Sequence, residues 1–300
     1  MLRNHIKDTY SDYSVMPGAE PFTYEGAGPV ACLFLHGFTS TPQTLREVAG
    51  VLNRRGITCR APLLPGHGTH VTDLNGRSWH ELEASAEREL LALCHSYQKV
   101  LIVGESSGAT IAIRLAAKHK DKVAGVVSVG GALVFPFDKV ARTILPIYKH
   151  ISPMQRKIKV ADVCDRKALR ERVAYRFIPM HMFHRLLQYA QLAIADLSDL
   201  EAPFLIMHAK QDHSVSPRSA EIMRKRVGSR YKKVIWYSRS YHNLLIDLEK
   251  QRVFKDIEHF VKRIERSRNV ATNKFDVAER RSLDARGTDQ FIVDRGQHLS

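Results

Sequence analysis

The sequence lacks the segments that would place this chain in or across a membrane. Polar residues, among them Arg, Asn, Lys and Asp, are distributed through residues 1–14, and this stretch has no apolar core of the kind found in a signal peptide. The longest largely apolar stretch, Val123–Phe137, is interrupted by glycines and is shorter than the ~20 residues that a membrane-spanning helix needs. We therefore expect a cytoplasmic protein without a membrane-spanning helix.

Cysteine is scarce and widely spaced, and phosphate-binding loops are missing. The four cysteines are Cys32, Cys59, Cys94 and Cys164, a spacing that offers neither a CxxC redox pair nor a zinc site. Neither GxGxxG nor GxxxxGK[ST] occurs in the chain. We expect reduced thiols, the first two of them in the core, and no cofactor or metal.

Negative charge is in short supply. The chain has 46 Lys and Arg against 31 Asp and Glu, a formal net charge of +15. Much of the excess lies between Phe135 and Leu200, with 12 Lys and Arg against 6 Asp and Glu, and no basic motif is interleaved with aromatic residues. This distribution disfavours a nucleic-acid partner. A solvated basic face, an anionic substrate and transient contact with an anionic membrane or lipid remain open interpretations.

The chain does have the composition of a globular protein with one sizeable core, 44% hydrophobic and 26% charged. From Val30 to His259, short apolar runs alternate with longer amphipathic stretches, which predicts βα repeats and a mainly parallel sheet. Most of the predicted strands are rich in Val, Ile and Leu, as in strands covered on both faces. They are Val30–Leu35, Ile57–Ala61, Val100–Val103, Val123–Val129, Phe204–His208 and Lys233–Tyr237.

Helices are predicted between these strands. Thr41–Arg55 begins with Thr-Pro, an N-cap followed by proline at the first helical position. Ser78–Cys94 begins with Ser78 followed three residues later by Glu81, the pattern of a capping box. Three further helices are expected over Ser107–Lys118, Pro217–Val227 and Leu248–Arg266.

A long insertion is predicted within the βα repeats. More than 70 residues separate the strand that ends at Val129 from the one that begins at Phe204, far more than an ordinary connection. Apolar positions at helical period within it predict a small helical insertion over residues 135–199. Residues 1–134 and 200–267 would then form the core, and the polar stretch 268–300 is expected to be disordered.

The strongest local motif is Gly104–Gly108, which reads G-x-S-x-G. It follows the strand Val100–Val103 and precedes the helix that begins at Ser107, the context in which this motif forms a nucleophile elbow. Only Ser106 is centred between the two glycines. We therefore predict Ser106 as the nucleophile and the backbone N–H of Ser107 as one oxyanion-hole donor.

A second oxyanion donor is expected after the strand Val30–Leu35, where Gly37 permits a tight turn that directs the Phe38 amide toward the substrate carbonyl. His67 lies in another glycine-rich loop. A structural role is predicted for His67, because no acid partner is evident.

A serine nucleophile also needs a histidine base and an acid, in the chain order Ser, Asp or Glu, His for this architecture. His242 follows the last strand, and Asp212 follows the strand Phe204–His208 by a short loop. Asp138 is an alternative acid, since some enzymes of this architecture place the acid after the preceding strand. The short loop favours Asp212, because it restricts where the carboxylate can lie.

Taken together, these motifs resemble those of bacterial carboxylesterases and monoacylglycerol lipases of the α/β-hydrolase superfamily, and the likeness runs from Pro17 to Arg266. The segments that carry it are Phe34–Thr39, Leu64–Thr69, Gly104–Gly108 and Ser240–His242, with Asp212 in its place.

The resemblance implies an α/β-hydrolase fold, a mainly parallel sheet flanked by helices with an inserted helical lid over 135–199. It implies a catalytic triad of Ser106, Asp212 and His242, an oxyanion hole formed by the amides of Phe38 and Ser107, and hydrolysis of a small-molecule carboxylic ester through an acyl-enzyme. Alternatives are a thioesterase or another acyl hydrolase of this fold, and a non-catalytic basic surface-binding module on a hydrolase scaffold.

The elbow departs from the family pattern at two positions. Related elbows commonly have a hydrophobic residue before the serine and Met or Leu after it, whereas this chain has Glu105 and Ser107. The departure predicts a more polar or smaller acyl pocket.

Overall fold

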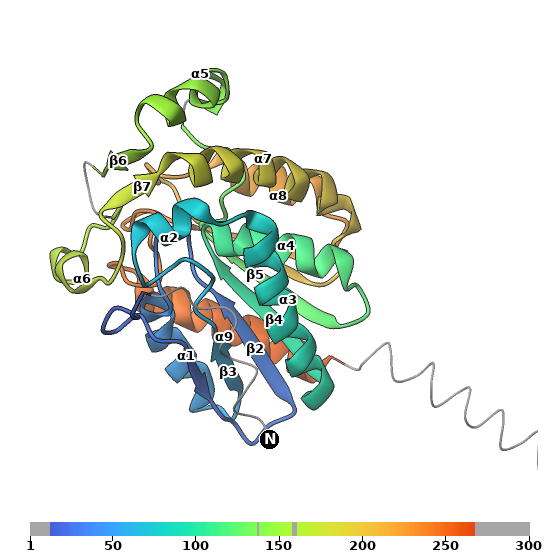
Figure 1. The fold of residues 1–300 in the computed structure, drawn as a ribbon. Helices are drawn as coiled ribbons and strands as arrows, with labels where there is room; N and C mark the ends of the chain where they lie inside the picture. Colours follow the sequence, from blue (N-terminus) through green and yellow to red (C-terminus); the bar gives the residue numbers. More distant parts are fainter. Residues whose placement is uncertain (1–12, 137, 158–160, 268–300) are drawn as a thin grey trace, which may run out of the picture. The chain divides into compact units, whose positions relative to one another are not determined.

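The computed structural model describes residues 13–136, 138–157 and 161–267 (Figure 1). The chain divides into a compact unit that extends to Glu265 and a second unit that begins at Arg266. The disorder predicted for 268–300 concerns residues outside the described part. Among the described residues, no helix combines the length and the apolar character needed to cross a lipid bilayer.

A seven-stranded sheet forms the centre of the compact unit. Only β1 is antiparallel to its neighbour, and the other strands pair in parallel. This arrangement confirms the mainly parallel sheet of the α/β-hydrolase class. In spatial order the strands are β1 (Phe22–Tyr24), β3 (Thr58–Ala61), β2 (Val30–Leu35), β4 (Lys99–Glu105), β5 (Val123–Val129), β8 (Phe204–Ala209) and β9 (Lys232–Tyr237).

Helices cover both faces of this sheet, which explains why its strands are apolar throughout. Successive residues of β2 point to opposite faces of the sheet. Leu33 and Phe34 accordingly belong to two different buried clusters, one on each face. The helices of the first cluster are α3 (Trp79–Ser96), α4 (Ser107–Lys118), α7 (Met180–Asp196) and α8 (Arg218–Arg226), and those of the second are α1 (Arg46–Asn53) and α9 (Lys250–Arg266). Both sets of helices can be followed in Figure 1.

The predicted elements are confirmed with small differences at their ends. The Ser78 capping box forms, because the Ser78 hydroxyl accepts the Glu81 amide at 3.2 Å and the Glu81 carboxylate accepts the Ser78 amide at 2.6 Å. The stretch predicted as one helix over Thr41–Arg55 instead begins with a 3-10 turn over Pro42–Leu45. Outside the segment between β5 and β8, two short elements were not predicted, β1 and the helix α2 (Val71–Gly76).

The segment between β5 and β8 is not wholly helical, which corrects the sequence prediction. Two three-residue strands pair with each other in antiparallel fashion, and Met154 lies opposite Pro179. Such short strands form through contacts between distant residues and have no visible period of their own. In order, the segment contains α5 (Asp138–Ile151), β6 (Met154–Arg156), α6 (Arg166–Glu171), β7 (Phe177–Pro179), α7 and a 3-10 turn over Leu197–Asp199.

All four cysteines are free thiols in the structure. Cys32 on β2 lies opposite Cys59 on β3, and both are fully buried, as the sequence predicted. Burial raises the pKa of the Cys59 thiol to about 12, so this group is neutral and behaves as a small apolar side chain.

Candidate active site

Ser106 occupies a sharp turn between the end of β4 and the start of α4. Its backbone has φ of 54° and ψ of −119°, a region that residues other than glycine rarely adopt. The flanking glycines make this turn possible. A Cβ atom at Gly104 would lie 2.4 Å from the Cα of Ala109, and one at Gly108 would lie 2.1 Å from the carbonyl oxygen of Leu35. Only glycine therefore fits either position.

The structure brings Ser106, His242 and Asp212 into one hydrogen-bonded series. His242 Nε2 lies 3.0 Å from Ser106 Oγ, and His242 Nδ1 lies 2.7 Å from Asp212 Oδ2. Their loops meet because the carboxyl ends of neighbouring parallel strands lie at the same edge of the sheet. Asp138, the alternative acid, instead forms an ion pair with Arg142 inside α5 at 2.6 Å.

Asp212 is held from several sides. Its Oδ1 accepts the backbone amides of Ser214 at 3.0 Å and Val215 at 2.8 Å. His208 Nε2 lies 3.2 Å from Oδ2, a contact that the sequence analysis missed. Burial alone would raise the pKa of Asp212, but His242 and the hydrogen bonds from His208 and His242 outweigh it and hold the pKa well below its usual value. The carboxylate is therefore ionised beside the imidazole.

His242 is buried, is hydrogen-bonded to the Asp212 carboxylate and interacts electrostatically with two further carboxylates. Burial alone would lower its pKa, but the charge and hydrogen bond of Asp212, together with the charges of Glu105 and Asp162, raise it above the ordinary value. The surroundings thus stabilise the imidazolium that forms when His242 takes a proton.

The two predicted oxyanion donors lie on backbone beside Ser106. A Cβ atom at Gly37 would lie 3.0 Å from Ser106 Cβ, so the turn that contains Phe38 runs directly against the elbow. Ser107 is the first residue of α4, where backbone N–H groups have no acceptor within the helix. Both amides thus belong to the immediate surroundings of Ser106.

His67 is buried against other rings and has no acid partner in the described part of the chain. Its ring lies edge-on to His36, 4.8 Å between centroids, and its Nδ1 lies 3.2 Å from the carbonyl oxygen of Pro65. Burial and the neighbouring His36 hold the pKa of His67 well below its ordinary value. These contacts fit the structural role that was predicted.

Aromatic side chains gather beside Phe38, a feature that motif reasoning missed. The Phe38 ring lies 6.0 Å from that of Trp79 and 6.3 Å from that of Phe183 on α7. Phe38 and Phe183 are both only partly buried. They offer an apolar surface next to the residue whose amide is the predicted oxyanion donor.

The two unusual residues of the elbow add no polar surface to an acyl pocket, which corrects that part of the expectation, and the smaller pocket stays a prediction. Glu105 is 1% exposed and Ser107 is 2% exposed. The Glu105 carboxylate accepts hydrogen bonds from Thr44 at 2.8 Å and Asn243 at 3.4 Å. Because both side chains are buried, neither adds polar surface that a ligand could reach.

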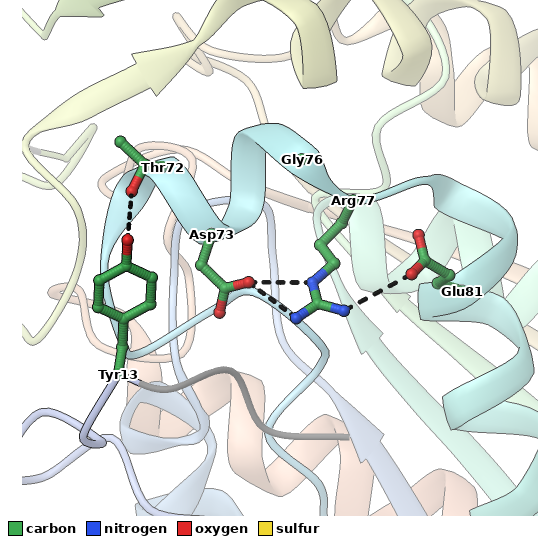
Figure 2. Close-up of a pocket in the computed structure, with 6 residues that line it drawn as sticks. All are labelled: Tyr13, Thr72, Asp73, Gly76, Arg77 and Glu81. Carbon is green, nitrogen blue, oxygen red and sulfur yellow. Dashed lines mark hydrogen bonds and ion pairs between the residues drawn. The ribbon is translucent and has the colours of Figure 1, made fainter. Parts of the chain in front are cut away.

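A pocket elsewhere on the molecule is not lined by a hydrogen-bonded series like that of Ser106, His242 and Asp212. It is lined by Tyr13, Thr72, Asp73, Gly76, Arg77 and Glu81 (Figure 2). Arg77 binds the Asp73 carboxylate at 2.8 Å and reaches Glu81 at 3.6 Å. Its charged groups thus pair with each other, and none belongs to the Ser106 series.

Comparison with known proteins places the chain in a family. The family described as serine aminopeptidase, S33, matches residues 29–249. The thermostable monoacylglycerol lipase of Bacillus sp. (strain H-257) is 31% identical over 254 residues, which cover 83% of this chain and 97% of that protein. The carboxylesterase of Bacillus subtilis (strain 168) is 25% identical over 254 residues, which cover 82% of this chain and 97% of that protein.

Solved structures agree in fold. One from a study of the metagenome-derived lipolytic enzymes LipS and LipT has a TM-score of 0.78 and 25% identity, and covers 83% of this chain and all of that one. The monoacylglycerol lipase of Paleococcus ferrophilus has a TM-score of 0.72 at 16% identity over 82% of this chain and 98% of that one. Because the family matches residues 29–249 and one relative is 31% identical over 83% of this chain, the chain belongs to the S33 serine aminopeptidase family of α/β-hydrolases.

Proposed function

We propose that this protein is a serine hydrolase that cleaves carboxylic esters, of the carboxylesterase or monoacylglycerol lipase type, through an acyl-enzyme on Ser106. The observation that carries the proposal is the hydrogen-bonded series from Ser106 through His242 to Asp212 at a strained elbow. The names of the two curated relatives support an ester as the substrate class.

The reaction has two halves, and in each half His242 acts first as a base and then as an acid. His242 Nε2 takes the Ser106 hydroxyl proton while Oγ bonds to the ester carbonyl carbon, and the amides of Phe38 and Ser107 stabilise the oxyanion. His242 then gives its proton to the departing alkoxide, so the acyl group stays on Ser106. A water molecule repeats the sequence and releases the carboxylic acid. Asp212 stays ionised and keeps Nδ1 protonated throughout.

The aromatic group beside Phe38 supports an apolar acyl chain. The partly buried rings of Phe38 and Phe183 lie next to the predicted oxyanion donor, and Phe135 packs edge-on to Phe183 at 5.4 Å. On this basis we propose short or medium acyl esters, monoacylglycerols included, as substrates. A thioester would use the same residues, so substrate comparison must separate the two classes.

We also propose that residues 135–199 act as a lid that contacts anionic lipid surfaces. Four apolar residues of α5 recur at helical spacing and are 53–75% exposed: Val140, Ile144, Ile147 and Ile151. The same region has 12 Lys and Arg against 6 Asp and Glu. An apolar stripe on a basic segment suits the surface of a membrane with anionic headgroups. The cytoplasmic location stays a prediction from sequence.

Labelling with a fluorophosphonate probe, followed by a chain-length series of p-nitrophenyl esters and thioesters, tests the enzymatic proposal. Ser106→Ala should abolish labelling and hydrolysis. Ser107→Ala is the matched control and should retain most of both, because alanine keeps the backbone N–H. A wild-type protein that neither reacts with the probe nor hydrolyses any ester would favour the non-catalytic surface-binding module. Loss of labelling in the Ser107 variant alone would reverse the assignment of the nucleophile.

A further inference from the structure

A buried carboxylate lies beside the proposed nucleophile and has no part in the reaction described above. Glu105 directly precedes Ser106 and is 1% exposed. One of its oxygens accepts the Thr44 hydroxyl at 2.8 Å, and the other accepts the Asn243 side-chain amide at 3.4 Å. Burying a carboxylate is costly unless hydrogen bonds and an opposite charge compensate it. We therefore expect a positively charged group close to Glu105.

That cation is Arg172, and Asn243 bridges the two charges. The Asn243 side-chain oxygen accepts Arg172 Nη1 at 2.8 Å, while its amide nitrogen donates to Glu105. Only one orientation of the amide group meets both demands, since the cation requires the oxygen and the anion requires the N–H. Burial lowers the pKa of Arg172 and the Glu105 charge raises it, so the two groups also interact electrostatically.

The backbone next to Arg172 is tied to the loop that follows Phe38. Val173 donates its amide to the Gln43 side chain at 2.7 Å and accepts the Thr41 hydroxyl at 2.9 Å. Arg172 itself donates Nη2 to the Ser40 hydroxyl at 3.1 Å. The guanidinium is thus held in place and is not a freely moving surface group.

The three members of this network come from three parts of the site. Arg172 lies between α6 and β7, within the proposed lid. Asn243 follows His242, and Glu105 precedes Ser106. One chain of polar contacts therefore connects the proposed lid to the neighbours of the base and of the nucleophile.

We propose that Glu105 is a second anion of this active site, a positioning residue that acts on His242 together with Asp212 and that Arg172 holds through Asn243. The proposal rests on the serine hydrolase function proposed above. Glu105 would stabilise the imidazolium by its charge, and Arg172 would moderate that charge and tie it to the lid. The hydrophobic residue common before the serine in related elbows would supply neither effect.

The pH dependence of kcat/KM tests the electrostatic part. The charged groups around His242 are Asp212, Glu105 and Asp162, with Arg172 reaching it through Asn243. Removing the Glu105 charge should lower the pKa of His242, so Glu105→Gln should move the acid limb to lower pH by ~0.5 to 1 unit. Arg172→Gln should move it to higher pH, because Glu105 is then less compensated.

A buried pair elsewhere provides the matched control. Glu83 is 8% exposed and binds Arg114 at 2.9 Å and the Tyr189 hydroxyl at 2.6 Å. Glu83→Gln should lower stability and leave the acid limb in place. If Glu105→Gln behaves like Glu83→Gln, or if the Glu105 and Arg172 variants shift the limb in the same direction, the proposal is wrong.

A double-mutant cycle in urea tests the coupling without any need for turnover. Each single variant leaves a buried charge uncompensated, so Glu105→Gln with Arg172→Gln should lose less stability than the two single losses added together. Additive losses would overturn the pairing. Urea unfolding can be measured whether or not the protein hydrolyses an ester. The cycle therefore tests the Glu105–Arg172 coupling independently of the hydrolase proposal, which the Ser106→Ala variant tests.

Discussion

The imidazole of His208 lies 3.2 Å from the Asp212 oxygen that also binds His242. His208 is on β8 and fully buried, four residues before Asp212. Its Nε2–H is thus placed to support the ionised carboxylate that binds His242. A hydrogen bond of this kind holds the Asp212 carboxylate, and through it the His242 ring, in one orientation.

We expect His208→Phe to lower kcat about tenfold, equivalent to ~1.4 kcal/mol of transition-state stabilisation. Phenylalanine keeps a ring in the core but cannot donate to Asp212. Steady-state kinetics should show the loss in kcat with little change in KM. His67→Phe is a control, because His67 is a buried histidine without a contact to Asp212. Equal losses in the two variants would indicate a general packing effect.

The proposed role of Asp212 as triad acid predicts a larger effect. Asp212→Asn should lose up to about 10⁴ in kcat at an unchanged melting temperature, since the amide cannot hold the imidazole in the same tautomer or stabilise the imidazolium. Asp138→Asn should change kcat less than about tenfold, because Asp138 pairs with Arg142 in α5. The reverse pattern would transfer the role to Asp138.

The sequence predicted those residues of the site whose role can be recognised from their neighbours in sequence. The elbow around Ser106 and the positions of Asp212 and His242 follow from motif, strand order and loop length. His208 and Arg172 carried no such signal. His208 is close to Asp212 in sequence, but the contact requires the chain to turn back after β8, and the contact of Arg172 with Asn243 forms only when distant segments meet. The sequence around Glu105 also did not predict that its side chain would be buried.

The fold shows the same division. Elements with a clear sequence pattern, such as β2 and α4, were predicted with the ends that the structure has. The three-residue strands β1, β6 and β7 were missed, since each is defined by its partner strand rather than by its own sequence. Propensity cannot identify a strand that consists of three residues.

Lys157 predicts a dependence of stability on pH. Its ammonium donates to the Thr39 hydroxyl at 2.6 Å, and burial, with the nearby Arg172, lowers its pKa to about 7. The unfolded chain keeps the ordinary value of about 10.4, so between these pH values the unfolded state binds more protons than the folded state. This group therefore makes the free energy of unfolding rise with pH from about 7 to about 10.

We expect Lys157→Met to be more stable than the wild type at pH 7, with the difference shrinking as the pH rises to 9. Urea unfolding at pH 7, 8 and 9 measures it. Lys167→Met, which removes an exposed lysine of α6, should show no such trend. A constant difference between wild type and Lys157→Met across this range would mean that Lys157 does not lose its proton there.

The exposed stripe of α5 predicts binding to vesicles. Ile144 and Ile147 are 53% and 69% exposed on one face of the helix, and inserting both into an acyl boundary should contribute more than ~1.4 kcal/mol, a factor of ten in affinity. Ile144→Ser with Ile147→Ser should therefore weaken sedimentation with phosphatidylglycerol vesicles at least about tenfold, while hydrolysis of a water-soluble short-chain ester and the melting temperature stay unchanged. Leu248→Ser is the control, because Leu248 is 53% exposed, as Ile144 is, but lies outside α5. Equal weakening by Leu248→Ser, or wild-type binding that does not depend on the anionic lipid, would contradict the lid contact.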